Sequence, residues 1–218
     1  MPIHPLFPVP MYVNPDCANE HKLDLDSVNN RLQNLEWERV YNDDPSYEPK
    51  GSTTVNKNIL RLPEFDDVRQ AIHKEMQKYV YGDLAVDPTG IRLDCNRSWS
   101  MKHKCLDYSH QHCHENCLWS GIFYTKMPEQ GGGLTFFKEP LRYTWILPAI
   151  KPKLKKNTEL TSNEIYVNPN EGCVVIFPGF VYHGTPANQS NEDRLNIVFN
   201  YSLKGEFGDD YYEKQTIR

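Results

Sequence analysis

Two stretches decide the fold: His110–Thr125, HQHCHENCLWSGIFYT, and Val175–His183, VIFPGFVYH. Each combines histidine with a run of apolar and aromatic residues. In the first stretch the histidines precede the run, and in the second a histidine ends it. The apolar runs are too short for a typical helix, so they favour buried β-strands. The sequence therefore predicts two buried strands that each carry histidine at one end.

The histidine spacing indicates a metal site. In an extended chain, side chains two residues apart lie on the same face, so His112 and His114 can converge on one ion. His183 comes at the end of a separate apolar strand and can supply a third ligand. A pair of ligands with a distant third leaves open positions on the ion for substrate and oxygen.

An arginine follows the third histidine at a separation that lets the chain turn and return toward the metal site. Arg194 lies eleven positions after His183 and opens a further apolar strand, with the polar turn Pro186–Asp193 between them. The returning strand would bring Arg194 back toward the metal, with Asn196 on the same face. The guanidinium group binds a carboxylate through two parallel hydrogen bonds, so a metal and an arginine together could hold a dicarboxylate by both ends.

The rest of the chain changes character near residue 90. The chain starts with an extended segment at Leu6–Val13. Helical spacing of apolar residues then predicts a helix over Asp24–Glu38, with Asp26 or Ser27 as N-cap. The same spacing predicts a second helix over Pro63–Tyr81, which ends at Gly82. The stretch Asn42–Asn58 reads as a loop. Later segments predict further short strands: Ile91–Cys95, Trp99–Met101, Leu118–Thr125, Leu134–Phe137, Glu164–Val167, Cys173–Phe177 and Leu195–Leu203.

These elements predict a single domain over residues 1–218 that is mainly β with α. Residues 1–88 would form an extended segment and supporting helices, residues 89–204 an antiparallel β jelly roll, and residues 205–218 a C-terminal tail. The length of 218 residues suits one large domain with a sizeable core.

Composition excludes several classes of protein. The net charge of −5 makes a nucleic-acid partner unlikely, because phosphate binding needs a concentrated positive surface. No apolar stretch approaches eighteen residues, and the proline-rich start does not resemble a secretory signal. The six cysteines are too sparse for a disulfide scaffold and read as reduced thiols. We expect a cytoplasmic protein; the sequence does not indicate its oligomeric state.

At this point a family resemblance becomes specific. The order HCHEN, SGIFY, GGGLTFF, GCVVIFPGFVYH, RLNIVFN resembles the Fe(II)/2-oxoglutarate dioxygenases of the double-stranded β-helix fold. The chain is most similar to a small subfamily found in bacteria and marine viruses, whose members open with LFP-x-P-x-Y, as Leu6–Tyr12 does here. The resemblance covers this opening and about residues 99–203. A viral source would place the protein in the host cytoplasm.

The resemblance implies cofactors and residue roles. It implies Fe(II) bound by His112, His114 and His183, with 2-oxoglutarate and O2 as cosubstrates. Arg194 would hold the far carboxylate of 2-oxoglutarate, helped by Asn196 and by Tyr124, which matches a tyrosine of similar prolyl hydroxylases. The superfamily usually has His-x-Asp/Glu where this chain has His-x-His, so the second ligand departs from the common pattern. Three neutral imidazoles leave the iron site one charge unit more positive than the usual set.

The implied reaction is hydroxylation of a substrate C–H, with release of succinate and CO2. Similarity to prolyl and aspartyl hydroxylases suggests a protein side chain, and a small molecule is the other substrate class. Two alternatives stay open. Cys105, Cys113 and Cys117 could join nearby histidines in a structural zinc site, or a cupin-like protein could use three histidines without 2-oxoglutarate. Arg194 discriminates, because only the oxygenase needs it to bind 2-oxoglutarate.

Overall fold

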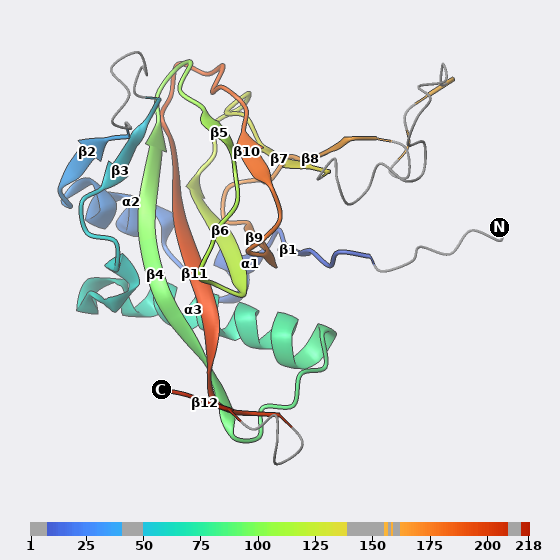
Figure 1. Ribbon diagram of the computed structural model, residues 1–218. Coiled ribbons are helices and arrows are strands. Elements are labelled where there is room, and N and C mark those ends of the chain that lie inside the picture. The colour runs from blue at the N-terminus through green and yellow to red at the C-terminus, as the bar shows by residue number, and fades with distance from the viewer. Residues whose placement is uncertain (1–7, 41–49, 139–154, 157, 159–161, 209–214) are drawn as a thin grey trace.

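The computed structural model describes residues 8–40, 50–138, 155–156, 158, 162–208 and 215–218 (Figure 1). Of the loop predicted over Asn42–Asn58, residues 42–49 lie outside these ranges, as do residues 6 and 7 of the extended start. The loop prediction is wrong for Ser52–Thr54, which form a short strand. The helices are α1 (Cys17–Glu20), α2 (Leu25–Gln33), α3 (Asp66–Gln77), the short 3₁₀ helices η1 (Ile59–Arg61) and η2 (Pro63–Phe65), and the π-helix η3 (Lys78–Asp83). Among the described residues, none of the helices has the length and apolar character needed to span a bilayer.

The two longer helices form where the apolar spacing predicts them, with different ends. Asp24 caps α2 in place of Asp26 or Ser27, because its carboxylate accepts a hydrogen bond from the Ser27 backbone N–H at 3.2 Å. The helical turns that start at Pro63 run on as far as Asp83, past Gly82. Helix α2 stops at Gln33, because residues 37–39 join a sheet.

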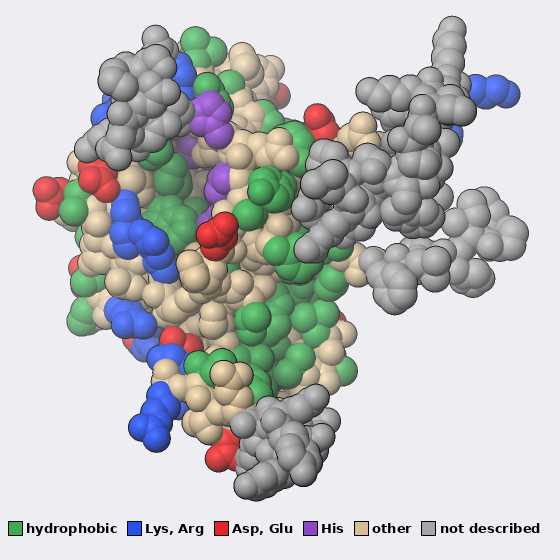
Figure 2. All heavy atoms as spheres, in the orientation of Figure 1, with side chains coloured by type: hydrophobic (Ala, Val, Ile, Leu, Met, Phe, Trp, Pro, Cys, Tyr) green, Lys and Arg blue, Asp and Glu red, His purple; other side chains and the backbone are tan. Residues whose placement is uncertain are grey.

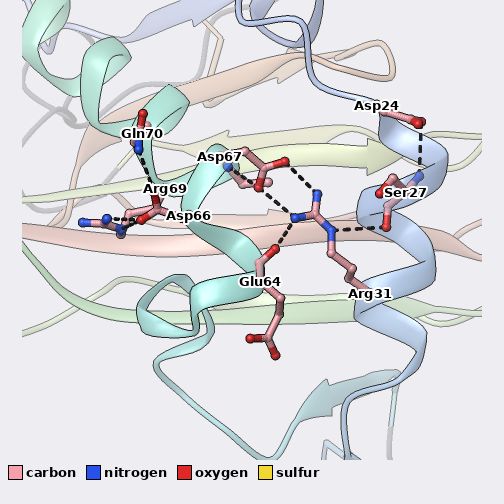
Figure 3. A network of polar contacts seen from close by, with 9 residues as sticks. Asp24, Ser27, Arg31, Glu64, Asp66, Asp67, Arg69 and Gln70 are labelled. Carbon is pink, nitrogen blue, oxygen red and sulfur yellow. Dashed lines mark hydrogen bonds and ion pairs between the residues drawn. The ribbon is translucent and has the colours of Figure 1, made fainter.

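Helices α2 and α3 are joined by a polar network (Figure 3). Arg31 of α2 donates two parallel hydrogen bonds, of 2.8 and 2.9 Å, to the carboxylate of Asp67 on α3. The same guanidinium group also donates to the backbone carbonyl of Glu64. Bidentate pairing of this kind fixes the orientation of both side chains, so it holds the two helices in a defined relative position.

Within the described residues, eight strands form a large antiparallel sheet in the order β1-β9-β6-β11-β4-β3-β2, with β12 paired to the end of β11. Their bounds are β1 Tyr12–Asn14, β2 Trp37–Arg39, β3 Ser52–Thr54, β4 Ile91–His103, β6 Trp119–Lys126, β9 Val174–Pro178, β11 Arg194–Phe207 and β12 Gln215–Ile217. The long strands β4 and β11 pair along nearly their whole length and form the centre of the sheet.

Four strands form a smaller antiparallel sheet in the order β5-β10-β7-β8. They are β5 Ser109–His112, β7 Leu134–Phe137, β8 Glu164–Val167 and β10 His183–Thr185. An apolar cluster joins the two sheets, with Ile122 of β6 and Val175 of β9 on one side and Leu134 of β7 on the other. The two facing antiparallel sheets are the double-stranded β-helix, or jelly roll, that the sequence predicts.

The opposite face of the large sheet carries the helices (Figure 1). Because side chains alternate between the two faces of a strand, Phe123 points away from its neighbour Ile122 and packs in a second cluster with residues of α2 and α3, among them Leu32 and Ile72. The sheet thus has one face against the helices and one face toward the small sheet. The second face is where the candidate site lies.

The N-terminal third contributes more strand than the sequence predicts. Strands β1, β2 and β3 all lie within residues 1–88 and extend the large sheet at both edges, so this region is more than supporting helices. The two short runs predicted near residues 91–101 are one continuous strand, β4. The expected C-terminal tail begins inside β11, which continues to Phe207, and its end returns as β12.

Candidate functional site

Three histidines come together between the sheets. His112 ends β5 and His183 begins β10, and the two residues are direct partners in the antiparallel register. His114 lies two residues beyond the end of β5, where its backbone N–H donates to the carbonyl of Gly179 at 2.8 Å. The three residues offer ligand nitrogens that lie within 4.8 Å of one another. A spacing of this size lets three imidazoles surround one metal ion.

Each of the three imidazoles has its Nδ1 beside a hydrogen-bond acceptor. Nδ1 of His112 lies 2.7 Å from the carbonyl oxygen of His110, and Nδ1 of His183 lies 2.9 Å from that of Val181. Nδ1 of His114 lies 2.8 Å from Oδ1 of Asn200 on β11. An acceptor at Nδ1 places the proton there and leaves the lone pair on Nε2, which is the form that binds a metal.

Burial keeps two of these rings neutral. Removal from water lowers the pKa of His183 to about 3 and the pKa of His114 to about 4, since the charged imidazolium is poorly solvated between the sheets. Both rings are therefore uncharged at neutral pH, which suits a metal ligand.

Arg194 is a fully buried cation at the first position of β11, opposite His103 of β4. Its Nη1 donates to the carbonyls of Gly131 and Gly132 at 2.6 and 2.7 Å. Its Nε and Nη2 have no hydrogen-bond partner among the described residues. Burial lowers the pKa of Arg194 to about 10, so the group is still charged at neutral pH. A buried cation with free donors is complementary to a carboxylate.

Tyr124 and Asn196 lie close to this arginine. They are register partners on β6 and β11, and both side chains are buried. Burial raises the pKa of the Tyr124 phenol, while the nearby positive charge of Arg194 acts in the opposite direction. The side-chain oxygen of Asn196 has no partner among the described residues. The three residues expected to bind 2-oxoglutarate therefore lie near one another, two of them with unused polar atoms.

A cavity of about 430 Å³ opens beside the three histidines. Asn196, Val198 and Ile122 form part of its floor, together with Trp99 and His103 of β4. Arg194 and Tyr124 lie deeper and do not line it. The volume is within the range of pockets that bind small ligands.

Sequence reasoning missed three residues of this region. Asn200 anchors His114, and Ser120 of β6 lies 3.1 Å from the same ring nitrogen. His103 is also buried, and its Nδ1 has no partner among the described residues. The alternation of residues 97, 99, 101 and 103 toward the cavity could have revealed His103, had β4 been predicted as one strand.

The other polar residues of the histidine stretch lie elsewhere. Cys105 is exposed, Cys113 and Cys117 are partly buried, and none of these three joins a metal-binding group among the described residues. Glu115 is exposed and lines a neighbouring cavity with the backbone turn that follows β5. Nothing in the described part of the chain therefore supports the structural zinc alternative.

Comparisons with known proteins agree with this fold. Residues 97–200 match the family model described as "Putative 2OG-Fe(II) oxygenase". No curated protein matches the chain. An oxidoreductase of the 2OG-Fe(II) oxygenase family from Burkholderia pseudomallei is 12% identical, with a TM-score of 0.57 over 82% of this chain and 78% of that one.

Two further solved structures are similar. HygX from Streptomyces hygroscopicus, with nickel and 2-oxoglutarate bound, is 16% identical with a TM-score of 0.57, over 89% of this chain and 83% of its own. The non-heme α-ketoglutarate-dependent epimerase SnoN of nogalamycin biosynthesis is 15% identical with a TM-score of 0.59, over 94% and 84%. At these identities the likeness shows the double-stranded β-helix fold.

Residues 97–200, slightly less than half of the chain, are thus similar to the 2OG-Fe(II) oxygenases, and the solved structures share the fold.

Proposed function

We propose that His112, His114 and His183 bind Fe(II) through Nε2. The observation that carries the proposal is the acceptor beside each Nδ1, at 2.7, 2.8 and 2.9 Å, because a proton held on Nδ1 leaves the Nε2 lone pair free for a metal, and the ligand atoms of the three residues lie within 4.8 Å of one another. A set of three nitrogen ligands suits iron and leaves the remaining positions for other molecules.

We propose further that Arg194 binds the far carboxylate of 2-oxoglutarate. The two unpartnered donors of Arg194 and its buried charge support this role. Tyr124 and Asn196, which are paired directly across β6 and β11, would add polar contacts. The dianion would also offset the positive charge that iron brings to three neutral imidazoles, because this set lacks the usual carboxylate ligand.

Bound Fe(II), 2-oxoglutarate and O2 supply the oxidising chemistry, with succinate and CO2 as coproducts. The chain itself contributes positioning. The histidines hold the metal, Arg194 fixes the direction of the cosubstrate, and the apolar side chains of Ile122 and Val198 limit the water that reaches the reacting centre.

The proposed reaction is hydroxylation of a C–H on a protein side chain or a small molecule. Solved structures of HygX with hygromycin B and of SnoN with nogalamycin RO contain small molecules, which supports the second class. The cytoplasmic location, the single-domain organisation and the absence of a nucleic-acid partner remain predictions from the sequence.

Anaerobic titration tests the proposal. Adding Fe(II) and then 2-oxoglutarate to the protein should produce the weak visible charge-transfer band of the chelate. The variant His183→Ala should lose most of the bound iron, while His110→Ala should keep it, because the contact of His110 with the ring of His112 is made by its backbone carbonyl, which alanine retains. Iron-loaded wild-type protein that shows no band with 2-oxoglutarate would reject the assignment.

Arg194 separates the oxygenase from a cupin-like protein that binds metal without 2-oxoglutarate. We expect Arg194→Ala to keep iron and to bind 2-oxoglutarate at least about tenfold more weakly, since hydrogen bonds to a charged group contribute about 1.5–3 kcal/mol. Arg194→Lys keeps a positive charge at the buried position, so it controls for loss of binding that is caused by misfolding. It should bind 2-oxoglutarate with intermediate affinity. Wild-type protein that binds iron but no 2-oxoglutarate favours the cupin-like alternative, and unchanged affinity in both variants would mean that Arg194 does not hold 2-oxoglutarate.

A further inference from the structure

The cavity-facing side of β4 changes from exposed to buried along its length. Arg97, Trp99, Met101 and His103 alternate with residues that face the helices, and all four line the cavity. Arg97 is exposed, Trp99 and Met101 are half-buried and His103 is buried. Arg97 therefore stands at the mouth of the cavity, and His103 at its inner end.

The charges that line this cavity have one sign. Lys50, Lys57 and Arg97 are among its lining residues, and no Asp or Glu is, within the described part of the chain. Figure 2 shows histidine side chains in a hollow of this face, with Lys and Arg side chains gathered along one side. A positive lining in a protein of net charge −5 is a local feature that the overall composition does not explain.

Of the three cations, Arg97 is the one available to a ligand. Lys57 donates to Glu38 at 3.0 Å and to Thr53 at 3.1 Å, so its charge is largely used within the protein. Lys50 lies over the ring of Tyr108. The guanidinium group of Arg97 has no hydrogen bond or ion pair to any described residue, and its carbon lies 5.7 Å from the centre of the Trp99 ring.

Trp99 links Arg97 to the proposed iron site. Its ring stacks on His114 with the centroids 5.6 Å apart and an angle of 17° between the planes. A group bound to Arg97 would therefore lie close enough to place a neighbouring C–H beside the metal.

Arg97 and Arg194 occupy opposite ends of the same sheet face. Arg194 pairs with His103 and Asn200 pairs with Arg97, so six residues of β11 separate the two rungs. At about 3.3 Å per residue this separation is about 20 Å. A molecule as short as 2-oxoglutarate cannot span both arginines. Arg97 is therefore available to the primary substrate, the molecule that is oxidised.

We propose that the primary substrate carries an oxyanion, a carboxylate or a phosphate, that binds Arg97 at the mouth of the cavity. The inference rests on the proposed iron and 2-oxoglutarate site, and it adds the chemical class of the molecule that is oxidised. The guanidinium group is suited to this role because it presents paired donors to a planar or tetrahedral oxyanion.

The test uses protein loaded with Fe(II) and saturating 2-oxoglutarate without oxygen, so that Arg194 is already occupied. Calorimetric titrations with phenyl phosphate, phenylacetate and 2-phenylethanol compare a phosphate, a carboxylate and a neutral probe. At least one of the two anions should bind about tenfold or more tightly than the alcohol. The stronger of the two identifies whether phosphate or carboxylate is preferred.

Variants assign the effect to this residue. Arg97→Gln should weaken the preferred anion about tenfold or more, and Arg97→Lys should weaken it less. Arg92→Gln, an exposed arginine on the same strand that does not line the cavity, should leave it unchanged. Metal content and 2-oxoglutarate affinity should stay within about twofold in all three variants, as expected for residues that contact neither iron nor 2-oxoglutarate.

The proposal is overturned if the anions bind no better than the alcohol, if Arg97→Gln leaves their binding intact, or if this variant loses iron or 2-oxoglutarate. Failure of the underlying iron site would look different, because wild-type protein would then bind neither iron nor 2-oxoglutarate. In that case the same anion titrations on metal-free protein still report whether Arg97 binds oxyanions.

Discussion

At the scale of single residues, the hydrogen bonds behind the three histidines decide which ring nitrogen can bind a metal. Two of the acceptors are backbone carbonyls only two residues from their histidines, at positions 110 and 181. The third is the side chain of Asn200, 86 residues away in sequence. His114 is thus the one ring of the three whose orientation depends on a replaceable side chain.

Replacing Asn200 tests this dependence. In Asn200→Ala the ring of His114 loses its nearest acceptor, and we expect metal affinity to fall about 10- to 100-fold, as is common when such a hydrogen bond is removed. Competition with a chelator measures the affinity. Asn30→Ala, at an exposed position of α2, is the matched control. Equal affinity in the two variants would mean that Ser120 alone is enough to orient the ring.

The sequence could predict the grouping of His112, His114 and His183, because their spacing and their place at strand ends carry that information. Their role as ligands stays a prediction. The sequence could not predict Asn200 as a partner of His114, because that contact depends on how β11 registers against its neighbours. His103 was missed for a similar reason: its position opposite Arg194 depends on the register of β4.

At the scale of elements, the short strands of the site carry the weakest sequence signal. Strand β5 reads SHQH and β10 reads HGT, and neither shows an apolar alternation. Strand β4 was predicted as two runs because the cavity-facing Arg97 interrupts the apolar pattern. Polar residues of the candidate site replace apolar ones at these positions. The alternating apolar pattern that indicates a strand is therefore lost where the site lies. The buried strands β6, β7 and β9 and the exposed strand β8 were predicted to within one residue at each end.

Strand β6 tolerates no side chain at Gly121. A Cβ there would come within 2.3 Å of the Phe199 ring on β11 and 3.0 Å of the Val175 carbonyl on β9. Because Phe199 is fully buried, its ring has little room to move, and we expect Gly121→Ala to lower the free energy of unfolding by about 1–3 kcal/mol. Urea unfolding measures the change.

Gly82→Ala is the control for this substitution, because a Cβ at that position meets nothing within 4 Å. Its stability should equal or slightly exceed that of the wild type. A Gly121→Ala protein as stable as Gly82→Ala would show that the centre of the large sheet can shift to make room.

At the scale of the whole molecule, the buried carboxylate of Glu75 ties the N-terminal region together. It accepts hydrogen bonds from Tyr12 and Asn14 of β1 at 2.7 and 2.8 Å, and it pairs with His21 and Lys78 at 2.7 Å. The edge strand β1 is thereby attached to α3 as well as to β9. Cys17 is close enough to complete a potential metal-binding group, but the existing donors already satisfy the carboxylate.

This cluster predicts a loss of stability in acid. Burial alone would raise the pKa of Glu75, but the hydrogen bonds from Lys78, Asn14, His21 and Tyr12 outweigh it and lower the pKa from 4.5 to about 2. A carboxylate with a lowered folded-state pKa stabilises the protein fully above pH 4.5, and the stabilisation disappears as the pH falls toward 2. Urea unfolding at pH 7 and at steps between pH 4.5 and 2 measures the loss.

The variant Glu75→Gln should remove this part of the pH dependence and cost about 3 kcal/mol at pH 7, because it leaves buried donors without a charged partner. Glu64→Gln, at an exposed position, should retain the wild-type profile. If wild-type and Glu75→Gln proteins lose stability in parallel between pH 4.5 and 2, the cluster is not the source of the acid sensitivity.

The division of the three histidines between the sheets has a consequence for the molecule as a whole. His112 and His183 belong to the small sheet, whereas His114 is hydrogen-bonded to Asn200 and Ser120 of the large sheet. An ion bound by all three would cross-link the two halves of the jelly roll. At a free metal concentration 100 times the dissociation constant, such linkage favours the closed arrangement by about 2.7 kcal/mol. Iron release and separation of the sheets would then be a single cooperative event. The metal would therefore stabilise the fold as well as take part in the reaction.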